Sequence, residues 1–191
     1  AAGETRSGIT IHFVNPELDE GQHIAQFSVA LDPNDTPEDI ADKVHELEMK
    51  HYPSVIEQVI KDQRELLVKH KAFTPLPHKE GPGVGLPPQI FVPYKETMDI
   101  YENGLRVPDD ITLVWVDDNY GYMKRVSNPE EQKRSGRAGI YYHLSYLGAP
   151  HDYLWLNTTP PVLMYEELRK AYDHGADRYW LLNVGDIKPK L

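Results

Sequence analysis

The second half of the chain contains three short runs of β-branched and aromatic residues, and a helical pattern separates the last two. The runs are ITLVWV, which ends at Asp117, GIYYHLSY, which ends near Gly148, and RYWLLNV, which ends at Gly185. The helical pattern is PPVLMYEELRKAYDHGA, with proline at its start and glycine near its end, as expected for a helix. Strands that alternate with helices predict parallel β/α packing, so the predicted fold class is α/β.

Polar residues stand where each of these predicted strands ends. Asp117 and Asn119 follow the first run, His143 lies in the second, and Asn183 closes the third. The loops that follow parallel strands share one face of a sheet, which is where β/α proteins bind ligands. A single Asp after a strand is most often a helix cap or a turn former, whereas acids, amides and aromatics on three strands favour a sugar site. A Ser/His/Asp triad can also be drawn, but no G-x-S-x-G nucleophile elbow supports it.

The first third of the chain predicts two strands followed by a helix. GITIHFV and HIAQFSVAL are strand patterns, and the loop NPELDEG lies between them. Thr36 suits an N-cap and Pro37 the first helical position. Pro53 is expected to kink the helix or to start a new one over residues 54–70.

A loop rich in proline and glycine follows, over residues 73–89. It predicts a surface excursion, since neither a helix nor a strand interior accommodates this composition. A helix is expected to resume near Pro93 and to end at Asn103 and Gly104.

Composition excludes several classes of protein and of site. The chain has no cysteine, so disulfides and thiolate chemistry are absent, and neither HExxH nor a similar metal spacing occurs. No run of eighteen apolar residues predicts a membrane helix, and no signal-peptide pattern is present. Residues 1–60 carry 12 acidic and 3 basic residues, net −9, and residues 61–191 carry 18 and 17, net −1. An acidic chain disfavours nucleic-acid binding. The asymmetry indicates two segments of different origin, or one acidic helix.

From about residue 59 to its end the chain resembles glycoside hydrolase family 115, the xylan α-1,2-glucuronidases. The matching stretches are YKETMDIYENGLRVPDDITLVWVDDNYGYMKR, AGIYYHLSYLGAPHDYLWLNTTPP and YWLLNVGDIKP. The resemblance implies a catalytic TIM barrel, here a partial one over residues 59–191. It also implies inverting action without a cofactor on glucuronic or 4-O-methylglucuronic acid side chains of glucuronoxylan, with a general acid and a general base.

The family's site positions fall on four residues of this sequence, Glu96, Asp117, Asn119 and Asn183. Glu96 is assigned as the general acid, and an acid in apolar surroundings has the raised pKa that this role needs. Asp117 and the two asparagines would orient sugar hydroxyls or a partner carboxyl, and Asn183 or Arg125 would hold the sugar carboxylate. The rest of the family's site is not found in this sequence, so we expect catalysis to be incomplete.

Residues 1–58 resemble the C-terminal part of phosphoribosylglycinamide formyltransferase. In HFVNPELDEG the resemblance assigns His12 and Asp19 to the active site, and an Asp close to a His would fix its tautomer for acid/base work. We expect the two side chains to lie within direct or one-water reach and to face a cleft. The alternative function is therefore formyl transfer, with 10-formyltetrahydrofolate as the cosubstrate.

Together the resemblances describe a chimera joined inside SVIEQVIKDQRELL, a helix that both families can share. Its function is that of a glucuronidase-like fragment, a formyltransferase, or a non-catalytic scaffold in which the site residues are remnants. The open edge of a partial sheet favours self-association. A hydrolase of this kind would be periplasmic or secreted, and a formyltransferase would be cytoplasmic.

Overall fold

A computed structural model describes the chain except for residues 1–2, 18–19, 71–73, 76–83, 147–158 and 185–191. It divides into two compact units. The first comprises residues 1–86 and 99–106, and the second comprises residues 87–98 and 107–191. The units are described separately below. None of the described helices has the length and apolar character needed to cross a membrane.

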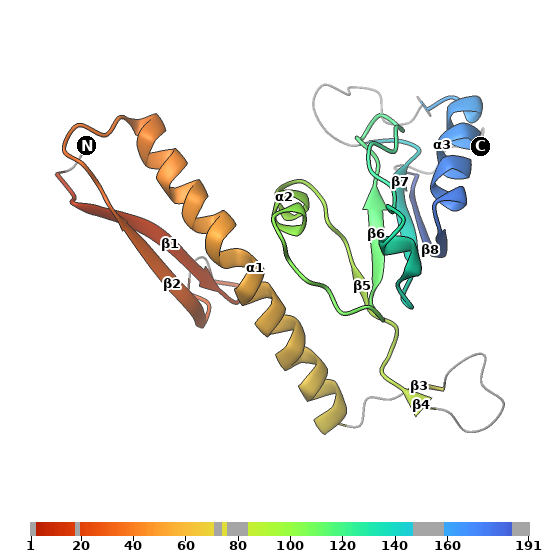
Figure 1. Cartoon of the computed structure of the whole chain (residues 1–191), viewed down its shortest axis with the longest axis horizontal. Coiled ribbons are helices and arrows are strands. Elements are labelled where there is room, and N and C mark those ends of the chain that lie inside the picture. The colour runs from red at the N-terminus through yellow and green to blue at the C-terminus, as the bar shows by residue number, and fades with distance from the viewer. Residues whose placement is uncertain (1–2, 18–19, 71–73, 76–83, 147–158, 185–191) are drawn as a thin grey trace. The chain divides into compact units, whose positions relative to one another are not determined.

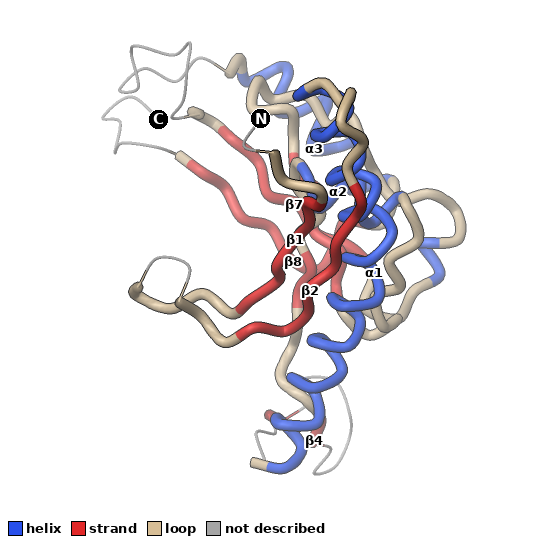
Figure 2. The backbone as a smooth tube through the Cα atoms, turned by 90° about the vertical axis from the view of Figure 1, so that its left-hand side faces the viewer, coloured by secondary structure: helices blue, strands red, loops and turns tan. Residues whose placement is uncertain are grey.

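The first unit is a β-hairpin packed on one long helix (Figure 2). Strand β1 (Arg6–His12) pairs antiparallel with β2 (His23–Ala30), and helix α1 spans Pro37–Lys69. Residues Thr36 and Asp39 form a reciprocal capping box that starts the helix. The Phe27 ring stacks on the His51 ring with 3.7 Å between centroids, joining β2 to α1. The predicted β-β-α order is confirmed.

Helix α1 runs through Pro53 without ending, so the start of a new helix, one of the two predicted outcomes, is wrong, and the kink stays a prediction. Proline has no N–H to donate to the carbonyl four residues earlier, which is that of Met49. That carbonyl instead accepts a hydrogen bond from Asn103 Nδ2 at 2.7 Å. One turn after Pro53, Glu57 Oε1 accepts the Arg106 N–H at 2.7 Å. Residues distant in sequence therefore form hydrogen bonds with α1 around Pro53, where the helix lacks one of its own backbone hydrogen bonds.

The loop predicted over residues 73–89 contains two very short strands. Strand β3 (Thr74–Pro75) pairs antiparallel with β4 (Val84–Gly85). Residues 76–83, which make up most of the expected excursion, lie outside the described residues.

The second unit is built on a four-stranded parallel sheet in the order β5-β6-β7-β8 (Figure 1). Its strands are β5 (Ile90–Phe91), β6 (Thr112–Val116), β7 (Ala138–His143) and β8 (Ala176–Asn183). Helix α2 (Glu96–Glu102) begins in this unit, a 3₁₀ turn η1 spans Glu131–Lys133, and α3 (Pro161–Asp173) precedes β8. The predicted parallel β/α fold is confirmed.

The core of this unit lies along β6 and β7. Four side chains are 0% exposed, those of Leu113, Trp115, Ile140 and Tyr142, and Val114 is 1% exposed. Trp115 Nε1 donates to Ser127 Oγ at 2.8 Å, and the Arg125 guanidinium lies 4.4 Å from the Trp115 ring centroid. Strand β6 thus reads as a nearly continuous apolar run because both of its faces are covered.

Candidate functional site

The carboxyl ends of the parallel strands bring four of the polar residues found in the sequence at strand ends to one edge of the sheet. Val116, the last residue of β6, pairs with Tyr141 of β7, and His143 pairs with Asn183 of β8. Asp117 follows directly after Val116 and donates its N–H to the Tyr141 carbonyl. We call Asp117, Asn119, His143 and Asn183 the strand-end site. The expectation that the late strands present these ends together is confirmed.

Asp117 and His143 form a buried ion-pair geometry at the centre of this site. Asp117 Oδ1 lies 2.6 Å from His143 Nδ1, and Asp117 Oδ2 accepts the His143 backbone N–H at 3.1 Å. The two residues are 4% and 3% exposed. A carboxylate can only accept, so Nδ1 carries the hydrogen and the imidazole presents Nε2 as its second functional atom. Asp117 therefore orients a histidine.

Aromatic rings surround His143. The Tyr141 ring centroid lies 4.6 Å away, and the Tyr146 ring meets His143 edge-on at 5.3 Å. The Tyr141 hydroxyl accepts a hydrogen bond from Asn183 Nδ2 at 2.9 Å. The imidazole, an amide and two tyrosines thus meet at one sheet edge, which is a mixture of flat faces and polar groups.

Asn119 occupies a strained backbone position beside this cluster. Its φ is +70°, a left-handed conformation that asparagine tolerates better than most residues. Its N–H donates to Asp117 Oδ1 at 3.2 Å, and its Oδ1 accepts from the Tyr94 hydroxyl at 2.9 Å. Lys95, with a φ of +51°, places Nζ 5.2 Å from the Tyr94 ring centroid. The chain of contacts runs from Asp117 through Asn119 and Tyr94 to Lys95.

The loop after β6 is held by its own polar groups. Asp118 Oδ1 accepts the N–H groups of Tyr120 and Tyr122 at 3.0 and 3.1 Å. The Gly121 carbonyl accepts from the buried Tyr142 hydroxyl at 2.9 Å. A side chain at Gly121, whose φ is +88°, would come within 2.9 Å of that hydroxyl and still closer to Thr159. These contacts fix the loop that carries Asn119.

Burial raises the pKa of Tyr142 to about 12, with smaller contributions from the nearby Asp117 and Glu167 carboxylates. Folding therefore favours the neutral phenol. The neutral phenol of Tyr142 therefore makes its full contribution to the free energy of unfolding below the ordinary pKa of 10.0. This contribution is lost as the pH rises toward 12.

We expect Tyr142→Phe to flatten the fall in stability between pH 10 and 12, by about 3 kcal/mol at most. At pH 7 the same change should cost about 1 kcal/mol, because the Gly121 carbonyl loses its donor. Urea unfolding at pH 7, 10 and 11 measures both effects. The matched control is Tyr172→Phe, on a side chain that is 55% exposed. Equal pH slopes for the two variants would contradict the expectation.

The remaining predicted site residues have other surroundings. Glu96, the first residue of α2, is exposed, so the apolar surroundings expected for a general acid are not there. Arg125 donates to both oxygens of Glu131 at 2.9 and 2.6 Å and stacks on Trp115. A substrate carboxylate would have to compete with Glu131 for that guanidinium. The catalytic role of Glu96 and the binding role of Arg125 stay predictions.

The formyltransferase pair is described only in part. His12 ends β1, and its Nδ1 lies 3.0 Å from the Phe13 carbonyl oxygen. Asp19 lies outside the described residues, so its expected proximity to His12 stays a prediction.

Nothing local in the sequence connects His143 with its partner Asp117, which lies 26 residues earlier. Strand register was the signal that connects them: two parallel strands adjacent in a sheet place residues after their last pairs side by side.

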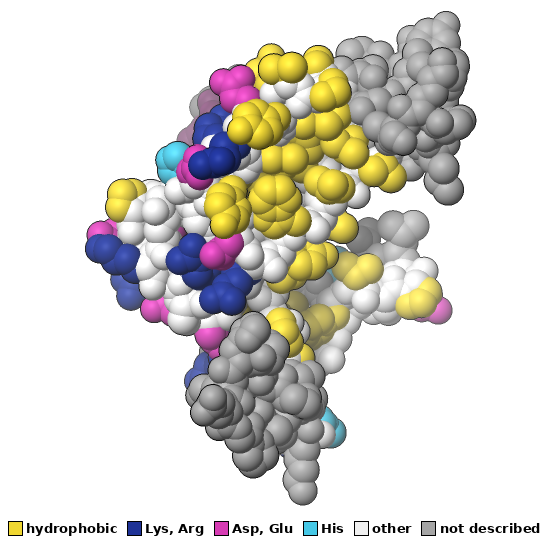
Figure 3. Space-filling view, turned by 90° about the vertical axis from the view of Figure 1, so that its right-hand side faces the viewer, with side chains coloured by type: hydrophobic (Ala, Val, Ile, Leu, Met, Phe, Trp, Pro, Cys, Tyr) yellow, Lys and Arg dark blue, Asp and Glu magenta, His cyan; other side chains and the backbone are white. Residues whose placement is uncertain are grey.

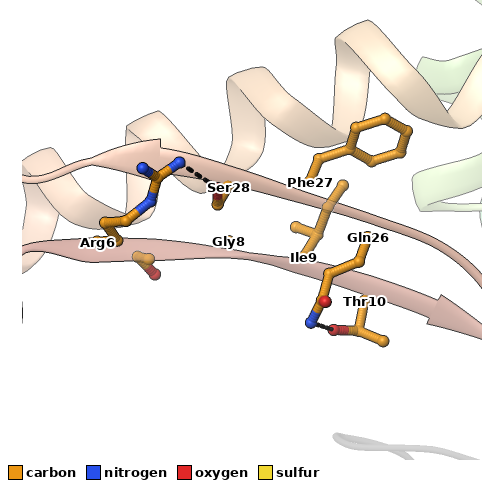
Figure 4. Close-up of a pocket in the computed structure, with 8 residues that line it drawn as sticks. Arg6, Gly8, Ile9, Thr10, Gln26, Phe27 and Ser28 are labelled. Carbon is orange, nitrogen blue, oxygen red and sulfur yellow. Dashed lines mark hydrogen bonds between the residues drawn. The ribbon is translucent and has the colours of Figure 1, made fainter.

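A pocket also lies on the first unit, over the paired strands β1 and β2 (Figure 4). Arg6 donates to Ser28 Oγ at 2.6 Å and Gln26 to Thr10 Oγ1 at 2.9 Å, so its polar groups are paired with each other. None of the predicted site residues lines it. Within the described ranges, no three His, Asp or Glu side chains gather as metal ligands would.

Comparison with known proteins gives two family matches. Glycosyl hydrolase family 115 matches residues 34–191, and the formyl transferase family matches residues 1–56. Both matches include residues 34–56, most of which belong to α1. The join between the two segments therefore falls in or near a helix, as in a chimera.

The relatives of the first segment are formyltransferases. The chain is 46% identical over 59 residues to phosphoribosylglycinamide formyltransferase of Bacillus subtilis (strain 168), covering 31% of this chain and 30% of that protein. It is 42% identical over 62 residues to the chloroplastic enzyme of Arabidopsis thaliana, covering 32% of this chain and 21% of that protein. The chain thus spans less than a third of the length of these relatives.

A solved structure is also similar to this chain. It is a family 115 4-O-methyl-α-glucuronidase with specificity for decorated arabinogalactans, 45% identical with a TM-score of 0.62. The match covers 74% of this chain and 17% of that one. Because the family match takes in residues 34–191, including the whole strand-end site, the chain belongs to glycosyl hydrolase family 115 and carries a formyltransferase-like segment before it.

Proposed function

We propose that the strand-end site binds the glucuronic or 4-O-methylglucuronic acid side chains of a plant polysaccharide. The observation that carries the proposal is the Asp117–His143 pair, buried between strand ends and flanked by the amides of Asn119 and Asn183. Oriented imidazole and amide groups are suited to sugar hydroxyls, and Tyr141 and Tyr146 add flat apolar faces. The likeness to a 4-O-methyl-α-glucuronidase supports the same class of ligand.

A sugar acid also needs a partner for its carboxylate, and we assign that role to Lys95. Arg125 is paired with Glu131, and Lys124 Nζ lies 3.4 Å from Asp118 Oδ2. Lys95 instead lies over the Tyr94 ring, whose hydroxyl contacts Asn119. Left-handed non-glycine residues are unfavourable and concentrate at functional sites. Lys95 and Asn119 both adopt that conformation and are joined through Tyr94.

Hydrolysis with inversion needs two carboxyl groups on opposite sides of the anomeric carbon, one of which activates water. Both oxygens of Asp117 are already engaged by His143. Asp117 is therefore a positioning residue, and Glu96 beside Lys95 remains as the candidate acid. We propose binding with hydrolysis that is very slow or absent.

Titration calorimetry of the full chain with glucuronate tests this proposal. We expect a Kd in the millimolar range, or roughly 4 kcal/mol. The methyl ester of glucuronic acid, which keeps the hydroxyls and loses the charge, should bind about tenfold more weakly, because a charge-assisted hydrogen bond is lost. Lys95→Gln should lose this preference for the acid over the ester.

Lys133→Gln is the matched control, because Lys133 is exposed and paired with Glu130 in the same unit. A wild-type chain that binds neither ligand would remove the proposed function. Wild-type preference for glucuronate that persists in Lys95→Gln would leave the site in place and show that another group holds the carboxylate.

Formyl transfer is the alternative function, favoured by the relatives of the first 59 residues. The described residue that this activity needs is His12, whose Nδ1 lies 3.0 Å from the Phe13 carbonyl oxygen. Asp19, the other residue assigned to this activity, lies outside the described residues. The strand-end site has more of its predicted groups in contact, so glucuronate binding is the better supported function.

A further inference from the structure

Asn103 and Gly104 form a chemically reactive pair just after helix α2. Asparagine is a thermolabile residue, and it is least stable before glycine, which has no Cβ to hinder its backbone nitrogen. The sequence contains this dipeptide once. Both residues are exposed, so water reaches them. They belong to the first unit, together with α1.

The backbone around the pair has the geometry of a helix C-terminus. Gly104 has a φ of +103°, and its N–H donates to the Tyr101 carbonyl at 3.2 Å. The Leu105 N–H donates to the Ile100 carbonyl at 3.3 Å. The two hydrogen bonds form a Schellman motif, but both are longer than the usual N–H···O distance of about 2.9–3.0 Å. The backbone alone therefore holds Gly104 weakly.

Shorter hydrogen bonds fasten this segment to α1. Asn103 Nδ2 donates to the Met49 carbonyl at 2.7 Å. Pro53 has no N–H with which to give that carbonyl its usual helical hydrogen bond. A little further along the chain, the Arg106 N–H donates to Glu57 Oε1 at 2.7 Å. The segment is thus held to α1 on both sides of the proline.

We propose that Asn103 and Gly104 are a site of self-modification by deamidation, and that these two hydrogen bonds restrain the reaction. The Gly104 nitrogen gives its proton to water and attacks Asn103 Cγ. The new bond closes a succinimide ring, the bond from Cγ to Nδ2 breaks, and Nδ2 leaves as ammonia. Water then opens the ring at one of its two carbonyls and leaves aspartate or isoaspartate at position 103. Water is the one co-reactant.

The restraint is geometric. The attack requires the Asn103 side chain to turn toward its own backbone, which breaks the hydrogen bond from Nδ2 to the Met49 carbonyl. The Gly104 N–H must also leave the Tyr101 carbonyl. The segment therefore has to detach from α1 before it reacts. The rate in the folded chain then follows the fraction of time for which the segment is open.

The product cannot form the same contact again. A carboxylate has no hydrogen to donate, so the Met49 carbonyl would face another acceptor. Isoaspartate also adds a methylene group to the main chain directly before the turn at Gly104. Helix α1 cannot supply the missing donor, because Pro53 has none. Deamidation therefore makes a transient opening of this segment permanent.

The other asparagines are internal references for the reaction. Each of them precedes a larger residue than glycine. Asn15 and Asn128 precede prolines, which have no N–H. Asn183 ends β8, on a side of the second unit where hydrophobic side chains gather (Figure 3), and precedes the branched Val184. Conversion should therefore be confined to Asn103.

Peptide mapping by mass spectrometry, on the full chain held at pH 8, tests the restraint. We expect Asn103 to convert at least about tenfold more slowly in the folded chain than in the same chain unfolded in guanidinium chloride. The other asparagines should remain amides in both samples over the same period.

Variants of Glu57 test the hydrogen bonds without changing the reactive pair. Glu57→Ala releases the Arg106 N–H and should speed the conversion in the folded chain at least about threefold. Glu57→Gln keeps an oxygen that accepts this N–H, so its rate should stay close to that of the wild type. Glu65→Ala is the matched control on α1, since Glu65 is 66% exposed in its pair with Lys61.

Hydrogen exchange tests the consequence. Asn103→Asp reproduces one product as a pure protein. The N–H groups of Leu105 and Arg106 should exchange about tenfold faster in this variant than in the wild type, because the segment has lost a donor to α1. A wild-type chain aged until Asn103 has converted should show the same acceleration.

Four results would overturn the proposal. The first two are equal conversion rates in the folded and unfolded chains, and a Glu57→Ala rate equal to that of the wild type. The third is Glu57→Gln reacting as fast as Glu57→Ala, which would show that the charge of Glu57 controls the rate and its hydrogen bond does not. The fourth is unchanged exchange of the Leu105 and Arg106 N–H groups in Asn103→Asp.

Discussion

Asp117→Ala is expected to lower the free energy of unfolding by about 3–4 kcal/mol and to abolish glucuronate binding. Removing one member of a buried pair leaves the other without its partner, and this typically costs about 3–5 kcal/mol. Here the loss reaches both the imidazole Nδ1 and the backbone N–H of His143, and the N–H of Asn119 as well. The left-handed turn at Asn119 then loses one of its anchors.

Urea unfolding at pH 7 and glucuronate titration measure the two effects. Asp109→Ala is the control, since Asp109 is 82% exposed in its pair with Arg134 and a surface pair contributes about 0–1 kcal/mol. The loss in the free energy of unfolding for Asp117→Asn should fall between those of Asp117→Ala and Asp109→Ala. The amide oxygen still accepts a hydrogen bond, whereas the amide nitrogen faces another donor. An Asp117→Ala protein within 1 kcal/mol of the wild type would show that the pair adds little to this fold.

Trp115→Ala is expected to have the largest effect on the second unit, about 4 kcal/mol. Truncating a fully buried tryptophan costs about 3–5 kcal/mol through lost transfer free energy and the cavity left behind. Trp115 is 0% exposed, and its removal also leaves the Ser127 hydroxyl without its indole donor and Arg125 without its stacking face.

Trp180→Ala is the comparison, since it makes the same chemical change at a side chain that is 43% exposed. Both proteins are unfolded with urea at pH 7 and at the same protein concentration. Trp180→Ala should cost no more than about 1 kcal/mol. Similar losses for the two variants would mean that the core is not centred on β6.

The elements of the second unit were predictable because local pattern and global packing agree there. Strand β6 is a β-branched run buried on both faces, and α3 has proline at its start and Gly175, with φ +89°, just after its end. A new helix after Pro53 was one of the two predicted outcomes, and α1 instead continues through this residue. A sequence shows the missing N–H of a proline, but it does not show that Asn103, 54 residues after Met49, bonds to the carbonyl thereby released.

The candidate site was predictable in its location and less so in its partners. Polar residues at strand ends placed Asp117, Asn119 and Asn183 correctly, because parallel strands share one direction. Which side chains pair with each other depends on the folded geometry, which a sequence does not show. Arg125 lies six residues before Glu131, and the 3₁₀ turn that begins at Glu131 brings its carboxylate to the guanidinium. The chain has many acidic residues, and the sequence did not show which of them pairs with Arg125.

Helix α1 has a consequence for how two gene segments can be joined. Each residue of an α-helix advances the backbone by about 100° around its axis, since a turn takes 3.6 residues. Adding or deleting one residue between Met49 and Glu57 would rotate everything beyond it, so that Glu57 and Met49 could no longer meet Arg106 and Asn103 at once. A junction inside this helix must therefore conserve angular phase as well as reading frame. An insertion of about seven residues, close to two turns, nearly restores the phase but lengthens the helix by about 10 Å, so the helix must keep its length between these two residues as well.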